Sequence, residues 1–394
     1  MFQNFLKDSR LLRALNELGY TTPTPIQEQA IPVCLDGRDI RGSAQTGTGK
    51  TAAFLLPALE LLSKGGSARG PRILILVPTR ELAIQVDNEA KKLAKYLPVK
   101  TVCVFGGVPY PLQTRQLQKQ YDILIATPGR LIDFLERKRV RLDCVEMLIL
   151  DEADRMLDMG FIEPVEFIAS NTPAERQTLM FSATFGKKVG KLAETLLREP
   201  IDVQVAATQQ NHERIKQKVQ YTDSLEQKHQ FLEEALSVDG QAIVFSSTKM
   251  QADELADLLC EKGFDAGALH GDMNQRQRTR TIQQLRQGRI RILVATDVAA
   301  RGIDIPNLSL VVNFDLPRTL DEYIHRIGRT GRAGGEGVAL SFASRRDRAM
   351  SREIEKFAGI APVFQEKKRE DRPRKPFNKF HKPGKKKFWS KKPG

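Results

Sequence analysis

The segment from Ala44 to Thr51 has the residue types and spacing of a loop that binds phosphate groups. Its sequence, AQTGTGKT, matches the Gly-rich phosphate-loop pattern, except that Ala44 replaces the first glycine. Gly47 and Gly49 allow the backbone N–H groups to face an anion, and a helix expected to start near Lys50 directs its positive end at the same point. Lys50 is expected to hold the terminal phosphates of a nucleotide, and the Thr51 hydroxyl to help bind Mg²⁺. The alternative is an ordinary Gly-rich loop, because chance matches to this pattern occur.

Three acidic residues follow a short apolar run about a hundred residues later. Leu148–Leu150 has the composition of a buried strand, and Asp151, Glu152 and Asp154 come directly after it. Open α/β sheets bind ligands at the carboxyl ends of their strands, so we expect Asp151 to bind magnesium and Glu152 to orient or deprotonate an attacking water. The alternative is that these acids only cap the next helix. We favour the magnesium site, because adjacent negative charges repel one another unless a cation offsets them.

Short apolar runs alternate with longer helical patterns along most of the chain, and these elements must position the two motifs. The runs contain four or five residues, mostly Ile, Leu and Val, which is typical of strands buried on both faces of a parallel sheet. In chain order they are Ile73–Val77, Thr101–Phe105, Ile123–Ala126, Met147–Leu150, Thr178–Phe181, Ala242–Phe245, Ile292–Ala295, Leu310–Asn313 and Val338–Phe342. Amphipathic patterns such as Arg80–Leu97 and Met250–Lys262 lie between them. This alternation predicts a doubly wound α/β fold with parallel sheets.

The alternation occurs twice, and 394 residues exceed what one hydrophobic core usually holds, so two domains are predicted. The first spans residues 1–205 and the second residues 217–364. Between them, residues 206–216 (AATQQNHERIK) are polar and without a buried-strand pattern, which predicts a linker. The second half has no Gly-rich phosphate loop, so the halves are expected to share an architecture but not a chemistry. Apolar periodicity stops after about Ala361, and residues 365–394 are predicted to be a disordered tail.

The net charge of +14 is concentrated in this tail. Residues 365–394 contain 13 Lys and Arg against three acids, which leaves only +4 for the rest of the chain. Aromatic residues interleaved with these charges have the means to stack on bases; they are Phe377, Phe380, Phe388 and Trp389. The tail is therefore predicted to bind RNA or another polyanion. The alternative is a solvated tail that only aids solubility.

Composition excludes several other classes of protein. A content of 41% hydrophobic and 28% charged residues excludes a collagen-like or wholly disordered chain. No apolar stretch approaches the roughly 18 to 20 residues of a membrane helix, and the N-terminus lacks the apolar core of a signal peptide. The four cysteines form no CxxC pair, which argues against a zinc site and a disulfide framework. We therefore expect a reduced, cytoplasmic protein that does not contact membranes.

The tetrad DEAD at residues 151–154, taken with the phosphate loop, closely resembles the DEAD-box RNA helicases of helicase superfamily two. About ten motifs follow that family's order between Phe2 and Phe342, which is nearly the whole chain apart from the tail. The resemblance implies two tandem RecA-like domains and an ATP-dependent RNA helicase with ATP and Mg²⁺ as cofactors. It implies RNA-dependent ATP hydrolysis that opens short duplexes locally, with Lys50, Asp151 and Glu152 as catalytic residues.

At the nucleotide, the resemblance assigns Gln27 to the adenine edge, places Tyr20 in the same motif, and has Phe2 stack on the base. A frayed terminus is the alternative for Phe2. Arg329 and Arg332 match the family's arginine fingers, which neutralise charge on the transferred phosphoryl group, and they fall one turn apart if their segment is helical. Further nucleotide contacts are implied for Ala44, Gln45, Thr46, Gly47, Thr48, Gly49, Thr51, Gly302 and Asp304.

Other motifs are implied to couple hydrolysis to strand separation or to bind RNA. The coupling residues would be Asp154, Ser182, Thr184, Asp297 and His325. The RNA-binding residues would be Pro78, Thr79, Arg80, Gly106, Gly107, Thr127, Pro128, Gly129, Arg130, Ser246, His270, Gly271, Gln275, Arg278 and Thr296. Contacts of this kind go to sugar and phosphate, so little sequence preference is expected, and 2′-hydroxyl contacts would select RNA. Ser246 departs from the family, which more often has a larger apolar residue or Cys there.

Two alternatives to this helicase function remain at the sequence level. One is a DNA-unwinding relative in the same superfamily, although the adenine-reading motif and Asp154 favour RNA. The other is an ATP-gated RNA clamp or annealing chaperone, which the basic, aromatic tail fits almost as well. The stretch LILDEADRMLDMGF is similar to bacterial members that assist ribosome assembly or RNA turnover. We favour ribosome assembly, with rRNA or ribosomal precursor particles as partners and a monomeric protein.

Overall fold

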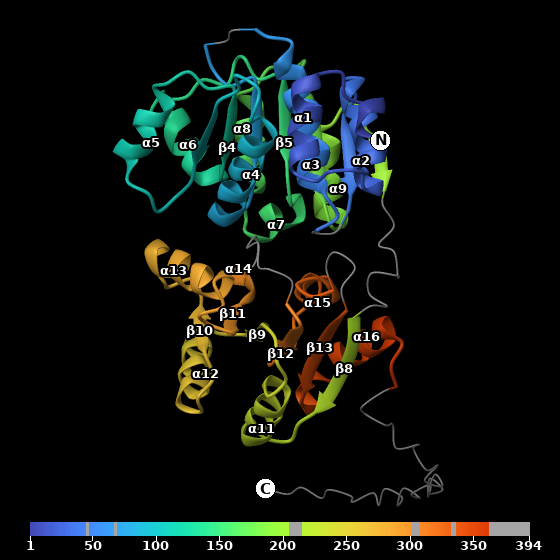
Figure 1. The fold of residues 1–394 in the computed structure, drawn as a ribbon, viewed down its shortest axis with the longest axis vertical. Coiled ribbons are helices and arrows are strands. Elements are labelled where there is room, and N and C mark those ends of the chain that lie inside the picture. Colours follow the sequence, from blue (N-terminus) through green and yellow to red (C-terminus); the bar gives the residue numbers. More distant parts are fainter. Residues whose placement is uncertain (45–46, 67–68, 205–214, 301–307, 332–335, 362–394) are drawn as a thin grey trace, which may run out of the picture. The chain divides into compact units, whose positions relative to one another are not determined.

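The computed structural model describes residues 1–44, 47–66, 69–204, 215–300, 308–331 and 336–361. These residues contain two parallel β-sheets, each with helices packed against it (Figure 1). The predicted doubly wound α/β fold is confirmed in both halves of the chain. The predicted tail and residues 206–214 of the predicted linker lie outside the described residues. Within the described part of the chain, no helix has both the length and the apolar composition needed to cross a membrane.

The first sheet has the strand order β3-β4-β2-β5-β6-β1-β7 among the described residues, with every pair parallel. Its strands are β1 Ile40–Ser43, β2 Ile73–Leu76, β3 Thr101–Val104, β4 Ile123–Ala126, β5 Met147–Leu150, β6 Gln177–Ser182 and β7 Ile201–Gln204. Its helical elements are η1 Phe2–Asn4, α1 Ser9–Glu17, α2 Pro25–Leu35, α3 Lys50–Ser63, α4 Arg80–Leu93, α5 Tyr110–Leu117, α6 Pro128–Glu136, α7 Ala153–Asp158, α8 Ile162–Ser170 and α9 Lys187–Leu196. Alternate residues of one strand enter different cores, as Ile73 and Leu74 do, because successive side chains point to opposite faces.

The second sheet has the order β10-β11-β9-β12-β13-β8 among the described residues and is also parallel. Its strands are β8 Ile215–Tyr221, β9 Ala242–Ser246, β10 Ala266–Leu269, β11 Ile292–Thr296, β12 Leu310–Asn313 and β13 Gly337–Ala343. Its helical elements are α11 Leu225–Leu236, α12 Lys249–Glu261, α13 Gln275–Arg286, α14 Asp297–Ala300, α15 Leu320–Ile327, η3 Arg345–Asp347 and α16 Arg348–Ala358. Two buried cores again cover its two faces, with Val244 in one and Ile243 in the other.

Every predicted apolar run is a strand, with ends that differ by at most one residue. Four strands were not predicted, namely β1, β7, β8 and β10. Three of these lie at the sheet edges formed by the described residues, where a strand has a neighbouring strand on one side only and polar residues are tolerated. The prediction of a linker through Lys216 is wrong at its end, because Ile215 and Lys216 already belong to β8.

Candidate functional site

The phosphate loop ends at the N-terminus of α3, where the sequence pattern predicts it. Gly47 and Gly49 have φ angles of 85° and 94°, which residues with a side chain rarely adopt. Lys50 is 6% exposed, and its Nζ has no hydrogen-bond partner among the described residues. A buried ammonium group without an acceptor is unfavourable, so this site fits an anion such as the phosphates of a nucleotide.

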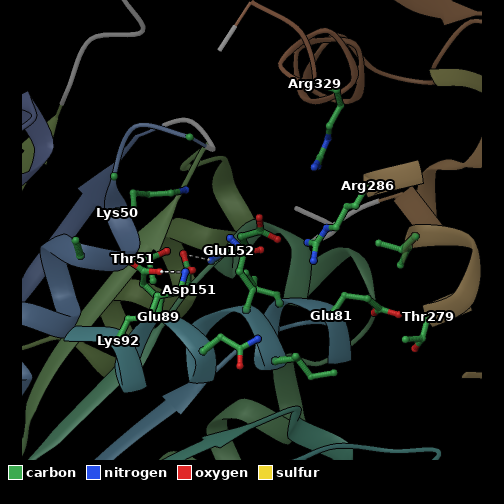
Figure 2. Close-up of a pocket in the computed structure, with 18 of the residues that line it drawn as sticks. Lys50, Thr51, Glu81, Glu89, Lys92, Asp151, Glu152, Thr279, Arg286 and Arg329 are labelled. Carbon is green, nitrogen blue, oxygen red and sulfur yellow. Dashed lines mark hydrogen bonds and ion pairs between the residues drawn. The ribbon is translucent and has the colours of Figure 1, made fainter. Parts of the chain in front are cut away.

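Asp151 and Glu152 lie with Lys50 and Thr51 in one cavity of about 650 Å³ (Figure 2). Both acids follow β5 at its carboxyl end, as predicted. Burial raises the pKa of Asp151, and the charge of Lys50 partly offsets this effect. The Asp151 carboxylate and the Thr51 hydroxyl are oxygen donors of the kind that Mg²⁺ prefers. The donor set therefore fits a magnesium ion held next to a nucleotide.

Glu152 forms a buried ion pair with Arg155, a residue that the sequence analysis did not identify. The pair joins Glu152 Oε2 to Arg155 Nη1, and the two residues are 7% and 6% exposed. Burial raises the pKa of Glu152, but the charges of Arg155 and Lys50 outweigh it, so the pKa lies below its usual range. Glu152 is thus held as a carboxylate, the form that accepts a proton from water. The three-residue spacing on α7 was the available sequence signal.

The idea that these acids only cap a helix does not describe Glu152. It occupies the N-cap of α7 in the left-handed conformation, with φ 53° and ψ 52°, and its side chain makes no capping hydrogen bond in the described structure. Asp154 instead contacts the predicted coupling motif. Its Oδ2 accepts hydrogen bonds from the N–H groups of Ala183 at 3.1 Å and Thr184 at 3.0 Å. Ser182 Oγ accepts one from the Asp154 N–H at 3.3 Å, so the tetrad and the motif form one network.

Gln27 joins two parts of the predicted nucleotide site. Its Oε1 accepts from the Thr24 N–H at 2.9 Å, and its Nε2 donates to the Gly49 carbonyl at 3.1 Å. The φ of 94° at Gly49 favours glycine, and a Cβ there would also lie 2.5 Å from this Nε2 and displace the amide. Phe2 is 3% exposed, and its ring lies edge-on to Tyr20 with centroids 6.3 Å apart. The frayed-terminus alternative for Phe2 is therefore wrong, whereas base contacts by Phe2 and Gln27 stay predictions.

Several predicted nucleotide contacts cannot be placed. Gln45, Thr46, Gly302, Asp304 and Arg332 lie outside the described residues. Ala44 is buried, and its N–H donates to the Ser182 carbonyl at 3.1 Å.

The predicted RNA residues of the first half lie at the carboxyl ends of three neighbouring strands, β3, β4 and β2. Arg80, after β2, packs against Gly107, after β3: a Cβ on Gly107 would lie 1.9 Å from Arg80 Nη1. Arg130, after β4, donates from Nη1 to the Val108 carbonyl at 2.9 Å and lies 4.2 Å from the Tyr110 ring centroid. Thr79 caps α4 by accepting from the N–H of Leu82 at 3.3 Å. The fold thus gathers these motifs along one sheet edge.

The predicted RNA residues of the second half gather in the same way, after β10, β11 and β9. Ser246 and Thr296 end adjacent strands and are direct register partners. Arg278 donates to the carbonyls of His270 at 3.3 Å and Ala299 at 3.4 Å, and it forms an ion pair with Glu81 at 2.8 Å. His270 is buried, with Nε2 2.8 Å from Asp253.

Arg329, the one of the two predicted arginine fingers that the structure describes, is not on a helix. α15 ends at Ile327 with Gly328 as its C-cap, so Arg329 lies beyond the helix. Arg329 lines the same cavity as Lys50 and Glu152 (Figure 2). In the same motif, burial lowers the pKa of His325, which favours the neutral imidazole.

Arg326 is the buried arginine of this motif, and the sequence analysis gave it no role. It is 3% exposed and pairs with Asp297, a predicted coupling residue, at 2.6 Å. Its Nη1 also donates to Asn313 Oδ1 at 3.0 Å and to the Asp315 carbonyl at 2.7 Å. Asp297 is therefore fixed within the second half by a buried charge.

Comparison with known proteins agrees with this geometry. Residues 24–192 match the DEAD/DEAH box helicase family, and residues 226–334 match the helicase conserved C-terminal domain. The chain is 47% identical over 351 residues to the ATP-dependent RNA helicase SrmB of Escherichia coli (strain K12), covering 88% of this chain and 79% of that protein. It is 42% identical over 360 residues to the DEAD-box ATP-dependent RNA helicase CshA of Bacillus subtilis (strain 168), covering 90% and 72%.

Two solved structures are also similar to this chain. The first is S. cerevisiae Dbp5 bound to RNA and ADP BeF3, with a TM-score of 0.81 and 32% identity over 91% of this chain and 94% of that one. The second is Mss116p bound to ssRNA and AMP-PNP, with a TM-score of 0.80 and 32% identity over 92% and 77%.

Proposed function

This chain belongs to the DEAD-box family of ATP-dependent RNA helicases, and we propose that it unwinds or remodels short RNA duplexes locally. It has two RecA-like α/β domains and is an RNA-dependent ATPase. The observation that carries the proposal is the buried Lys50 ammonium beside Asp151 and Glu152 in one cavity. This arrangement supports nucleotide hydrolysis as the source of the work.

In the proposed mechanism, Lys50 binds the terminal phosphates of ATP while the loop N–H groups face them. Thr51 and Asp151 would hold Mg²⁺, which offsets phosphate charge when it is bound. Glu152 orients the attacking water and accepts its proton, and Arg329 neutralises charge that develops on the transferred group.

Hydrolysis should depend on RNA, because the complete site forms only when ATP and RNA bring the two domains together. The network of Asp154 with Ser182 and Thr184 would relay the nucleotide state within the first domain. Local opening of a duplex, and not travel along it, is the expected outcome.

The Glu152→Gln variant tests this function against an ATP-gated clamp or annealing chaperone. It keeps the size of the side chain but removes the proton acceptor. An unwindase that recycles by hydrolysis should stall on RNA after one round, whereas a clamp should work as well as the wild type. Full multiple-turnover unwinding by Glu152→Gln would contradict the proposal.

We propose ribosome assembly as the process and rRNA or a ribosomal precursor particle as the partner. The proposal is supported by the 47% identity to a bacterial helicase and by the resemblance of the segment around residues 151–154 to bacterial members that assist ribosome assembly or RNA turnover. A strain that carries only the Lys50→Ala variant should accumulate ribosomal precursor particles in sucrose gradients. A profile identical to wild type would contradict this assignment.

The remaining proposals concern the tail and the state of the protein. Residues 365–394 should add RNA affinity, so their removal should weaken binding most at low salt while hydrolysis at saturating RNA is kept. Loss of that hydrolysis would refute a role limited to affinity. We further propose a monomeric protein in the reducing cytoplasm, which the four free cysteines support.

A further inference from the structure

Glu89 on α4 lies in the wall of the nucleotide cavity but belongs to none of the motifs described above (Figure 2). Its Oε1 accepts a hydrogen bond from the hydroxyl of Tyr20 at 2.8 Å, across 69 positions of sequence. A hydrogen bond to a charged acceptor is stronger than one between neutral groups. Glu89 therefore restrains the side chain of Tyr20 where both residues face the same cavity.

Tyr20 is held from three sides. Gly19, with a φ of 77°, turns the chain after α1, and the Tyr20 N–H donates to the Leu15 carbonyl at 2.9 Å. The ring packs against Phe2, and the hydroxyl is fixed by Glu89. Burial and the nearby Glu89 charge raise the pKa of Tyr20, so its hydroxyl remains a donor at neutral pH.

Tyr20 is also the aromatic residue of the cavity wall: none of the other described residues that line the cavity is aromatic. With the phosphates at Lys50, a planar base needs an apolar surface on this wall. Small shifts of that surface change the fit of the base without moving the phosphate-binding or water-activating groups.

We propose that Glu89 is a positioning residue for nucleotide binding, which acts through the hydroxyl of Tyr20. This inference rests on the ATP site of the proposed function. It assigns Glu89 a role in ATP affinity and in discrimination between ATP and GTP, and none in the chemical step.

The test is equilibrium binding of a fluorescent ATP analogue to the full chain, together with steady-state hydrolysis at saturating RNA. Glu89→Ala and Tyr20→Phe should each weaken analogue binding by about 3- to 10-fold, the usual effect of losing a partly exposed charged hydrogen bond. The double variant should bind like Tyr20→Phe alone, because the Tyr20–Glu89 bond is lost in all three and the exposed Lys92–Glu89 pair, at 3.4 Å, contributes little. KM for ATP should rise while kcat changes by less than about 2-fold, because the lost contact binds the ground state and the transition state equally. Glu89→Gln keeps an acceptor oxygen and should restore most of the affinity.

The chain offers a matched control in a second tyrosine–glutamate pair. Tyr96 donates to Glu17 at 2.5 Å, and neither residue lines the cavity. Glu17→Ala and Tyr96→Phe should bind the analogue like the wild type.

Wild-type affinity for the analogue in Glu89→Ala would overturn the inference. It would also be overturned if the affinity losses of the two single variants multiplied in the double variant, because Glu89 would then contact the nucleotide directly. The two proposals can fail separately. If the variants bind the analogue as expected but RNA does not stimulate hydrolysis by the wild type, the proposed function is refuted and the positioning role is supported.

Discussion

Replacing Arg326 with methionine should strongly destabilise the second domain. The guanidinium is 3% exposed and makes two bonds to Asp297, at 2.7 and 2.6 Å, plus the bonds to Asn313 and Asp315 described above. It also lies 4.9 Å from the ring centroid of Phe245. Removing one member of a buried ion pair costs about 3 to 5 kcal/mol, because the other charge is left without its partner. The Asp297 side chain is 22% exposed, so water offsets part of this cost and we expect about 3 kcal/mol.

Calorimetric unfolding of the full chain measures this loss. For a domain of this size, about 3 kcal/mol corresponds to a fall of roughly 6 to 12 °C in the unfolding midpoint. Arg348→Met is the matched control, because Arg348 is exposed on α16, and it should change stability by less than about 0.5 kcal/mol. Adding Asp297→Leu to Arg326→Met should recover part of the loss, since no unpaired charge remains. A destabilisation below about 1 kcal/mol, or no recovery in the double variant, would refute the buried-pair reasoning.

Three further outcomes follow from the site. Glu152→Gln should lower RNA-stimulated hydrolysis by at least about 100-fold, with ATP-analogue binding within a few-fold of wild type; hydrolysis near the wild-type rate would exclude Glu152 as the base. Gly107→Ala places a Cβ 1.9 Å from Arg80 Nη1 and should displace the guanidinium, so RNA affinity at low salt should fall by about 10-fold. ATP binding without RNA should be unchanged. RNA affinity equal to that of the wild type in filter binding would contradict the Arg80 contact. Chelation of Mg²⁺ should abolish hydrolysis reversibly. Asp151→Asn should raise the Mg²⁺ concentration that gives half-maximal hydrolysis, and an unchanged concentration would exclude Asp151 as a ligand.

The central strands were predictable because their residues are apolar on both faces. β2, β4 and β5 consist of Ile, Leu, Met and Ala, and their ends in the structure match the sequence pattern within one residue. Edge strands such as β7, IDVQ, bury one residue in four and carry no such pattern. The location of the acidic tetrad after β5 followed from the same strand pattern. The phosphate loop before α3 was found from its own glycine and lysine spacing, because β1 ahead of it was not predicted.

Contacts between distant residues were not predictable from one sequence. The pairs Arg326–Asp297 and Glu89–Tyr20 are 29 and 69 positions apart, and only the folded sheet brings them together. The end of α15 at Ile327, with Gly328 as its C-cap, was also not predicted from the sequence. The short-range pair Glu152–Arg155 has the three-residue spacing that a helical turn brings together, so the sequence carries a signal for it.

The most direct test of the account is ATP hydrolysis with no nucleic acid, with single-stranded DNA and with structured RNA, using Lys50→Ala as the blank. The account predicts strong stimulation by RNA alone and no activity above background in the Lys50→Ala variant. Equal stimulation by DNA, or hydrolysis that needs no nucleic acid, would contradict the claim that RNA completes the catalytic site.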